Sequence, residues 1–258
     1  MGGALLQGWL EKGYAAHGIC VIEHSEAATA QFDGIDGVTI VRDISDVPED
    51  FHPGMVMLAL KPQMMDAAAP LARYAGPETA FLSIAAGKTI QYFESLLGSD
   101  AAIIRSMPNT PAAVGRGITA YVGNKAASQA QMNLAGDLLS AVGEALEVPE
   151  EGMLDAVTAV SGSGPAYVFY VIEVMAAAGE KLGLPADLAM RLASATVSGA
   201  GELARQSSEP AAQLRQNVTS PGGTTAEALK VLMADDGIGP VFEKALKAAA
   251  DRSRELAG

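Results

Sequence analysis

The chain has 258 residues, of which 49% are hydrophobic, and its formal net charge at pH 7 is −13. This length is sufficient for a substantial core and for two domains. The excess of acidic side chains disfavours binding to nucleic acid and to anionic membrane surfaces, so we expect small molecules or further copies of the chain as partners.

Neither the cysteine content nor the hydropathy pattern indicates export or a membrane anchor. The single cysteine, Cys20, cannot form an internal disulfide, which suits a reducing cytoplasm. The longest apolar segment, residues 166–178, is too short to span a bilayer and contains Glu173. We therefore expect a cytoplasmic protein.

The first half of the chain alternates short apolar runs rich in β-branched residues with longer segments of helical pattern. This alternation is typical of βαβ units around a parallel sheet. The predicted helices include residues 4–12, 62–74 and 90–97. The predicted strands are residues 19–23, 38–41, 55–60, 80–84, 102–107 and 119–122. Together these elements predict an α/β domain with a doubly wound sheet over residues 1–149.

The second half, residues 150–258, is rich in alanine and reads as successive helices. The segment 167–175 is apolar on more than one face, so it must be covered on every side, and a second subunit can supply that cover. We expect an all-α domain that forms an intertwined homodimer. A core helix within a monomer is the alternative.

The sequence fits neither a metal site nor a serine nucleophile. His17, His24 and His52 do not pair with cysteine or carboxylate at ligand spacing. The run Ser-Gly-Ser-Gly at 161–164 does not match the G-x-S-x-G pattern, and no histidine follows it in the chain.

Loops rich in glycine and proline follow three neighbouring predicted strands, at residues 59–62, 83–87 and 107–111. Ligands of open α/β sheets bind in the crevice outside the carboxyl ends of the strands. Each loop alone could be ordinary turn chemistry. Their occurrence at consecutive strand ends favours a ligand site.

A fourth loop, residues 218–225, precedes a predicted helix. Serine or threonine as a cap, an early proline and two glycines together suit an anion site at a helix N-terminus, and a carboxylate would fit there. An ordinary capped helix start is the alternative. The loop lacks the lysine of a P-loop, so binding of a nucleoside triphosphate is disfavoured.

Five motifs, in the same order along the chain, resemble the pyrroline-5-carboxylate reductase family. They are Ala-Leu-Lys-Pro at 59–62, Ala-Ala-Gly at 85–87, Met-Pro-Asn-Thr-Pro at 107–111, Ser-Gly-Ser-Gly-Pro-Ala-Tyr at 161–167 and Ser-Pro-Gly-Gly-Thr-Thr at 220–225. The resemblance covers essentially the whole chain. It implies an N-terminal Rossmann domain for NADPH or NADH and a helical dimerisation domain, with dimers that assemble into rings such as a decamer. The implied reaction is the reduction of 1-pyrroline-5-carboxylate to L-proline by hydride transfer, the last step of proline biosynthesis.

The resemblance also implies roles for individual residues. The implied cofactor-binding residues are Met1, Gly2, Ala59, Leu60, Lys61, Pro62, Ala85, Ala86, Gly87, Asn109 and Asn217. The implied substrate-binding residues are Ser220, Gly222, Gly223, Thr224 and Thr225. Thr225 is also the candidate catalytic residue, which bonds to the ring nitrogen or relays a proton through water. Its alternative role is to bind the carboxylate or cap the helix only.

Glu23 bears on the choice of cofactor because it ends the predicted strand 19–23. An acidic side chain at this place accepts hydrogen bonds from a ribose diol and repels the extra phosphate of NADP. Glu23 therefore favours NADH, and a solvated glutamate at a strand end is the alternative.

The chain departs from the family pattern at its start. Family members begin with a strand that leads into Gly-x-Gly-x-x-Gly, whereas the first five residues, Met-Gly-Gly-Ala-Leu, match only the tail of this fingerprint. Without the first two glycines we expect weaker dinucleotide binding, and without the strand we expect exposed sheet edges. The explanations are a start assigned at an internal methionine of a longer gene, which we favour, or a genuine short form with weak activity.

Two other functions stay open on the sequence alone. A reductase of the same architecture acting on a β-hydroxy acid would need a lysine on the interdomain helix, and residues 167–180 contain none. A non-catalytic dimeric homologue would keep the carboxylate pocket and would not bind a dinucleotide.

Overall fold

The computed structural model describes residues 1–257, and their contacts divide the chain into two compact units. The first unit consists of Met1–Gly162 together with the segment that starts at Ala250, and the second is Ser163–Ala249. The boundary predicted after residue 149 lies before the end of the first unit at Gly162. The composition changes ahead of α5 (Met153–Val157), but this helix packs within the first unit.

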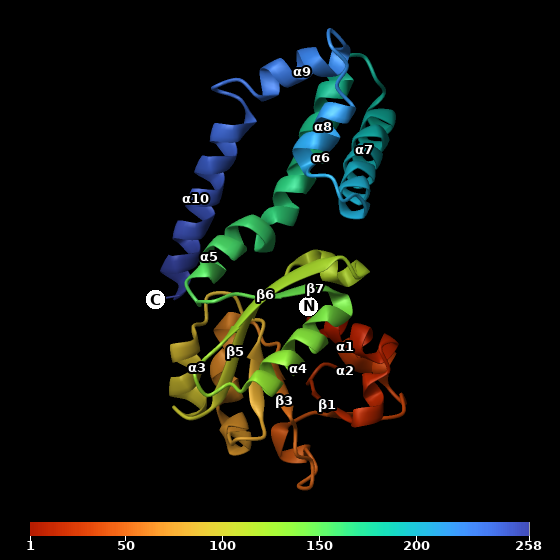
Figure 1. The fold of residues 1–258 in the computed structure, drawn as a ribbon. Helices are drawn as coiled ribbons and strands as arrows, with labels where there is room; N and C mark the ends of the chain where they lie inside the picture. The colour runs from red at the N-terminus through yellow and green to blue at the C-terminus, as the bar shows by residue number, and fades with distance from the viewer. Residues whose placement is uncertain (258) are drawn as a thin grey trace. The chain divides into compact units, whose positions relative to one another are not determined.

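The first unit alternates strands and helices, as predicted, and its α/β class is confirmed (Figure 1). Its strands are β1 (Ile19–Ile22), β2 (Val38–Val41), β3 (Met55–Leu58), β4 (Ala80–Ser83), β5 (Ala102–Met107), β6 (Gly117–Gly123) and β7 (Gly143–Glu147). Besides α5, its α-helices are α1 (Gly2–Glu11), α2 (Glu26–Thr29), α3 (Ile90–Leu97) and α4 (Gln129–Leu139). The predicted helix at Pro62–Tyr74 is a 3₁₀ helix, and Pro70 inside it has no N–H for an α-helical hydrogen bond.

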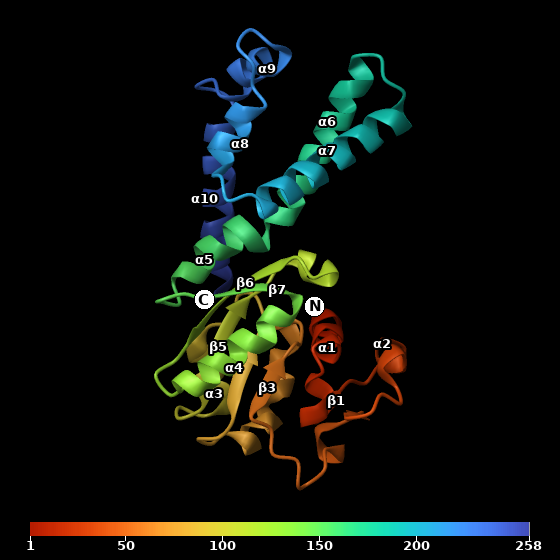
Figure 2. The ribbon, with the colours of Figure 1, turned by 45° about the vertical axis from the view of Figure 1, so that its right-hand side comes forward.

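The strands form two separate ladders. β1 pairs in parallel with β2, and a second sheet has the order β3-β4-β5-β6-β7. All neighbours in the second sheet are parallel except β5 and β6. In the described part of the chain, β1 pairs only with β2 and β3 only with β4, so each has one edge without a strand. Figures 1 and 2 show β1 on the β3 side of the larger sheet.

Helices cover both faces of the five-stranded sheet, which makes it doubly wound. Phe81 and Ile103 point to one face, where they pack with Phe93 of α3. Their neighbours along the strands, Leu82 and Ile104, point to the other face. There they join Leu5 of α1 and the buried side of α4, which crosses the strands in both views (Figures 1 and 2). Because both faces are buried, β4 and β5 are mostly apolar, and their polar residues, Ser83, Arg105 and Ser106, lie toward their carboxyl ends.

The second unit consists of helices, as predicted. They are α6 (Gly164–Lys181), α7 (Ala186–Gln206), α8 (Ala211–Asn217), α9 (Thr224–Leu232) and α10 (Ile238–Ala257), and the last part of α10 belongs to the first unit. Its buried core is small: Ala176 of α6 packs with Ala189 and Ala193 of α7. Large apolar side chains of α6 are exposed, including Phe169 at 59% and Tyr170 at 63%. Such a surface requires a partner.

Within residues 1–257, no helix is both long and apolar enough to cross a membrane. The same residues contain no group of three or more histidine, cysteine, aspartate or glutamate side chains that could hold a metal ion.

Candidate active site

The carboxyl ends of β3, β4 and β5 meet at one edge of the five-stranded sheet. In the parallel ladders Leu58 pairs with Ser83, and Ser83 pairs with Arg105. The loops that follow these strands therefore start side by side. They carry the predicted ligand-binding stretches at 59–62, 85–87 and 107–111, so the structure brings these three together.

The N-terminus of α1 lies against the first of these loops. A Cβ atom added to Gly2 would lie 3.0 Å from the Cβ atom of Ala59. Leu5, one turn further along, is fully buried and fixes the helix on the sheet. The first turn has no side-chain cap and no acidic residue, so its free backbone N–H groups and the helix dipole favour an anion. Met1 and Gly2 therefore fit a phosphate group beside Ala59.

The loop after β4 presents its backbone rather than its side chains. The side chain of Ala85 is buried in the core, and its N–H donates to the Oγ atom of Ser83 at 3.2 Å. Ser106 Oγ in turn donates to the carbonyl oxygen of Ser83 at 2.8 Å. Gly87 has φ +72°, a backbone conformation that residues other than glycine rarely adopt. Main-chain N–H and C=O groups are thus the groups that Ala86 and Gly87 offer to a ligand.

The first loop is the most open of the three. Ala59, Leu60 and Lys61 are exposed and Pro62 is half-buried, so all four lie at the surface. Lys61 is in the extended conformation that a following proline favours, which ends the strand and starts the 3₁₀ helix.

Asn109 links two of the motifs. Its Oδ1 atom accepts from the N–H of Ile118 at 3.0 Å, and its Nδ2 atom donates to the carbonyl oxygen of Ser161 at 3.2 Å. The side chain is 8% exposed. Asn109 therefore joins the loop after β5 to the π-helical turn Thr158–Gly162, which contains the first two residues of the Ser-Gly-Ser-Gly motif.

Sequence reasoning missed an ion pair beneath these loops, in which the arginine is buried and the glutamate is half-buried. Arg105 Nη1 lies 2.7 Å from Glu151 Oε1, and the arginine side chain is 7% exposed. The same carboxylate oxygen accepts from the N–H of Ile90, at 2.8 Å, at the start of α3. The signal was a single arginine in the apolar strand β5, but its partner lies 46 residues away and could not be identified.

A tyrosine beside the second loop is held neutral. Tyr92 donates its hydroxyl hydrogen to Asp66, and the Nζ atom of Lys88 lies 4.0 Å from the centroid of its ring. Partial burial, the bond to Asp66 and the negative charge of Asp66 raise the pKa of Tyr92 to about 12. Tyr92 therefore serves as a hydrogen-bond donor at neutral pH.

Glu23 lies just past the end of β1, on the two-stranded ladder. Its Oε1 atom accepts from the N–H of Ser25 at 2.9 Å, and its carbonyl oxygen accepts from Arg42 Nη1 at 2.8 Å. Among the hydrogen bonds of residues 1–257, none joins Glu23 to the three loops. Arg42, which also donates to Thr29 at 3.2 Å, is a cation at this strand end that the sequence analysis did not single out.

The predicted carboxylate loop lies in the second unit, at the start of α9. The expected serine or threonine cap is wrong: the N-cap is Gly223, with no side-chain cap, and Gly223 N–H donates to the Ser220 carbonyl at 3.0 Å. Gly222 has φ +70°, which lets the loop turn tightly. The free N–H groups at the start of α9 remain available to an anion. Thr224 is exposed and Thr225 is half-buried.

Asn217 lies close to this loop in the sequence, at the end of α8. Its Nδ2 atom donates to Glu209 Oε2 and its Oδ1 atom accepts from Gln213 Nε2, both at 2.8 Å. The side chain is exposed, so these bonds can exchange for bonds to a ligand.

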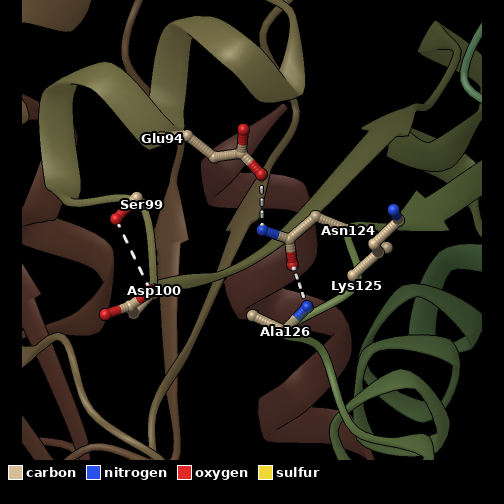
Figure 3. Close-up of a pocket in the computed structure, with 7 residues that line it drawn as sticks. Glu94, Ser99, Asp100, Asn124, Lys125 and Ala126 are labelled. Atoms are coloured by element: carbon tan, nitrogen blue, oxygen red, sulfur yellow. Dashed lines mark hydrogen bonds between the residues drawn. The ribbon is translucent and has the colours of Figure 1, made fainter.

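A depression elsewhere in the first unit is lined by a turn that side-chain hydrogen bonds stabilise. Figure 3 shows it between the end of α3 and the turn after β6, with Glu94, Asp100 and Lys125 in its lining. Asn124 at its centre accepts from the N–H groups of Ile103, Ala126 and Ala127 and donates to Glu94 and to the carbonyl of Ala101. The depression adjoins the amino end of β5, away from the strand-end loops.

Comparison with known proteins identifies the family of the chain. The family model for pyrroline-5-carboxylate reductase dimerisation matches residues 151–256. The chain is 41% identical over 258 residues to the pyrroline-5-carboxylate reductase of Pseudomonas aeruginosa, covering all of this chain and 93% of the relative.

Two solved structures share the fold over most of their length. The pyrroline-5-carboxylate reductase of Coxiella burnetii has a TM-score of 0.91 and 35% identity, covering 99% of this chain and 94% of that one. The pyrroline carboxylate reductase of Plasmodium falciparum, a structure with NADP bound, has a TM-score of 0.75 and 26% identity, covering 93% of this chain and 98% of that one. Because its identity to a known member extends over the full length, the chain belongs to the pyrroline-5-carboxylate reductase family.

Proposed function

We propose that the chain reduces 1-pyrroline-5-carboxylate to L-proline with NADPH or NADH, the last step of proline biosynthesis. The observation that carries this function is the 41% identity to a pyrroline-5-carboxylate reductase over the whole chain. No observation favours a homologue that has lost catalysis.

The cofactor would be held by the N-terminus of α1 and by the strand-end loops. In this proposal Met1 and Gly2 receive a phosphate, and the backbone of residues 59–62 and 85–87 holds the rest of the dinucleotide. Asn109 steadies the third loop, and Asn217 is the contribution of the second unit. When bound, the reduced nicotinamide supplies the hydride, and the protein positions the two reactants.

The substrate carboxylate would be held at the start of α9. Ser220, Gly222, Gly223 and Thr224 supply hydroxyl and N–H donors there, and the missing side-chain cap leaves these N–H groups free. The imine carbon takes a hydride and the ring nitrogen takes a proton, which turns the C=N bond into the C–N bond of proline. Thr225 would donate a hydrogen bond to that nitrogen or pass it a proton from water.

Glu23 is the residue by which we propose a preference for NADH. Its carboxylate can accept hydrogen bonds from a ribose diol, and it would repel a 2′-phosphate. Arg42, bonded to the carbonyl of Glu23 at 2.8 Å, is the residue that could offset this repulsion if NADPH is used.

The protein is a homo-oligomer, because residues 151–256 match a dimerisation domain and the helices expose apolar faces. Its substrate is a small molecule, as its membership of the reductase family implies. We further propose a ring of dimers, such as a decamer, located in the cytoplasm. We propose no nucleic acid or membrane partner, and the net charge of −13 on each chain supports this.

Substitution of Thr225 tests the proposed chemistry. Thr225→Val keeps the shape of the side chain and removes the hydroxyl, so we expect kcat to fall about a hundredfold, the lower end for lost proton-transfer assistance. Thr225→Ser should restore most of the activity. A raised KM for the substrate with kcat unchanged would limit Thr225 to binding the carboxylate.

A further inference from the structure

A segment distant in sequence approaches the loop Ala85–Gly87 closely at Gly87. A Cβ atom added to Gly87 would lie 3.1 Å from the carbonyl oxygen of Leu256 and 3.2 Å from its Cβ atom. Leu256 belongs to the part of α10 that packs in the first unit. The main chain of α10 therefore occupies the space beside Gly87.

A buried hydroxyl fixes this end of α10. Ser253 Oγ donates to Asp155 Oδ1 at 2.6 Å, which ties α10 to α5. Ser253 is 7% exposed and the neighbouring Ala250 is also buried. A hydrogen bond to a carboxylate in such surroundings is short and strong compared with a neutral one.

Two hydrogen bonds flank the loop on either side. Ala85 N–H donates to Ser83 Oγ, and Ile90 N–H, at the far end of the loop, donates to Glu151. These bonds hold the two ends of the loop. Between these two bonds, Gly87 is backed by α10 at Leu256.

The geometry points to Ser253 as a positioning residue for the cofactor. Its bond to Asp155 holds the end of α10 in place, and α10 in turn keeps the backbone at Gly87 in the conformation that receives the dinucleotide. This inference rests on the proposed function, in which residues 85–87 bind the cofactor. A loop ordered before binding loses less conformational entropy when the ligand arrives, so its affinity is higher.

The test is Ser253→Ala in the full chain. We expect KM for NADH and NADPH to rise about five- to tenfold, because one charge-assisted hydrogen bond behind the loop is lost. At saturating cofactor, kcat should stay within about twofold of the starting protein, since Ser253 acts in this proposal only on the order of the cofactor loop. Ser253→Thr, which keeps the hydroxyl, should restore KM. Arg252→Ala is the matched control on the same helix, because it removes only an exposed ion pair to Glu255 at 2.8 Å.

Amide hydrogen exchange gives a readout that does not depend on turnover. In Ser253→Ala the amides of residues 84–90 should exchange faster, while those of β5 should not change. Unchanged KM together with unchanged exchange at residues 84–90 would overturn the positioning role. If the unsubstituted chain shows no turnover, the proposed function fails, and the exchange measurement still decides whether Ser253 orders the loop.

A pair of glycine variants tests the close approach itself. Gly87 and Gly115 have similar backbone conformations, with φ +72° and +66°, but a Cβ atom at Gly115 would meet nothing within 4 Å. Both alanine variants therefore carry similar backbone strain, and only Gly87→Ala also meets α10. We expect faster exchange of the amides of residues 250–257 in Gly87→Ala than in Gly115→Ala. Equal exchange in the two variants would contradict the contact with Leu256.

Discussion

The pair of Arg105 and Glu151 lies where the strand-end loops join the core. Arg105 has little access to water, and Glu151 neutralises it while accepting the N–H of Ile90 at the start of α3. Removing Glu151 leaves the charge of the buried Arg105 without compensation, which costs more than the pair itself contributes.

We therefore expect Glu151→Ala to lower the free energy of unfolding by about 2 kcal/mol, measured by urea denaturation, which is less than for a fully buried pair because Glu151 is 30% exposed. The double variant Arg105→Met with Glu151→Leu should recover much of this loss, because no unpaired charge remains. Glu255→Ala, which breaks the exposed pair with Arg252, is the control and should change stability by about 0.5 kcal/mol at most. Equal losses in Glu151→Ala and Glu255→Ala would show that Arg105 is solvated in the folded state.

At the scale of single residues, the sequence predicts local turns but not the partners of buried polar side chains. Gly87 indicates a tight turn, and in the structure it has φ +72°. The partners of Asn109, Arg105 and Ser253 come from residues 52, 46 and 98 positions away. Such pairings depend on the packing of whole elements, which a local pattern does not contain.

At the scale of elements, several predicted limits agree with the structure and others differ by a few residues. β2, β5 and α3 have the predicted bounds, and β3 ends at Leu58, before the predicted residue 60, because the chain turns ahead of Lys61 and Pro62. β7 was not predicted, since Gly143, Glu144 and Ala145 have low strand propensity. Pairing with β6 overrides that propensity.

The separate ladder of β1 and β2 should be the least stable part of the first unit. A two-stranded ladder is marginal in water, and its residues are only partly buried or exposed, whereas β4 is buried throughout and pairs on both edges. In native-state hydrogen exchange we expect the amides of β1 and β2 to exchange at least about a hundredfold faster than those of β4. Equal protection in the two sheets would show that β1 and β2 unfold only with the whole unit.

At the scale of the whole molecule, the two units differ in how their apolar surface is covered. The first unit buries large side chains on both faces of its sheet. The second buries three alanines between α6 and α7 and exposes Phe169, Tyr170 and other large side chains. The helical pattern predicted this difference, because a helix that is apolar on several faces needs more cover than one short domain supplies. Oligomerisation provides that cover.

The function assigned to this molecule is tested most directly by turnover. Purified chain is mixed with 1-pyrroline-5-carboxylate and NADH or NADPH, and oxidation of the cofactor and formation of proline are followed in the same sample. We predict that both depend on the protein and on the imine, and that proline appears in an amount equal to the cofactor oxidised. Binding of proline or the imine without any cofactor oxidation would contradict the assignment and leave a carboxylate-binding oligomer.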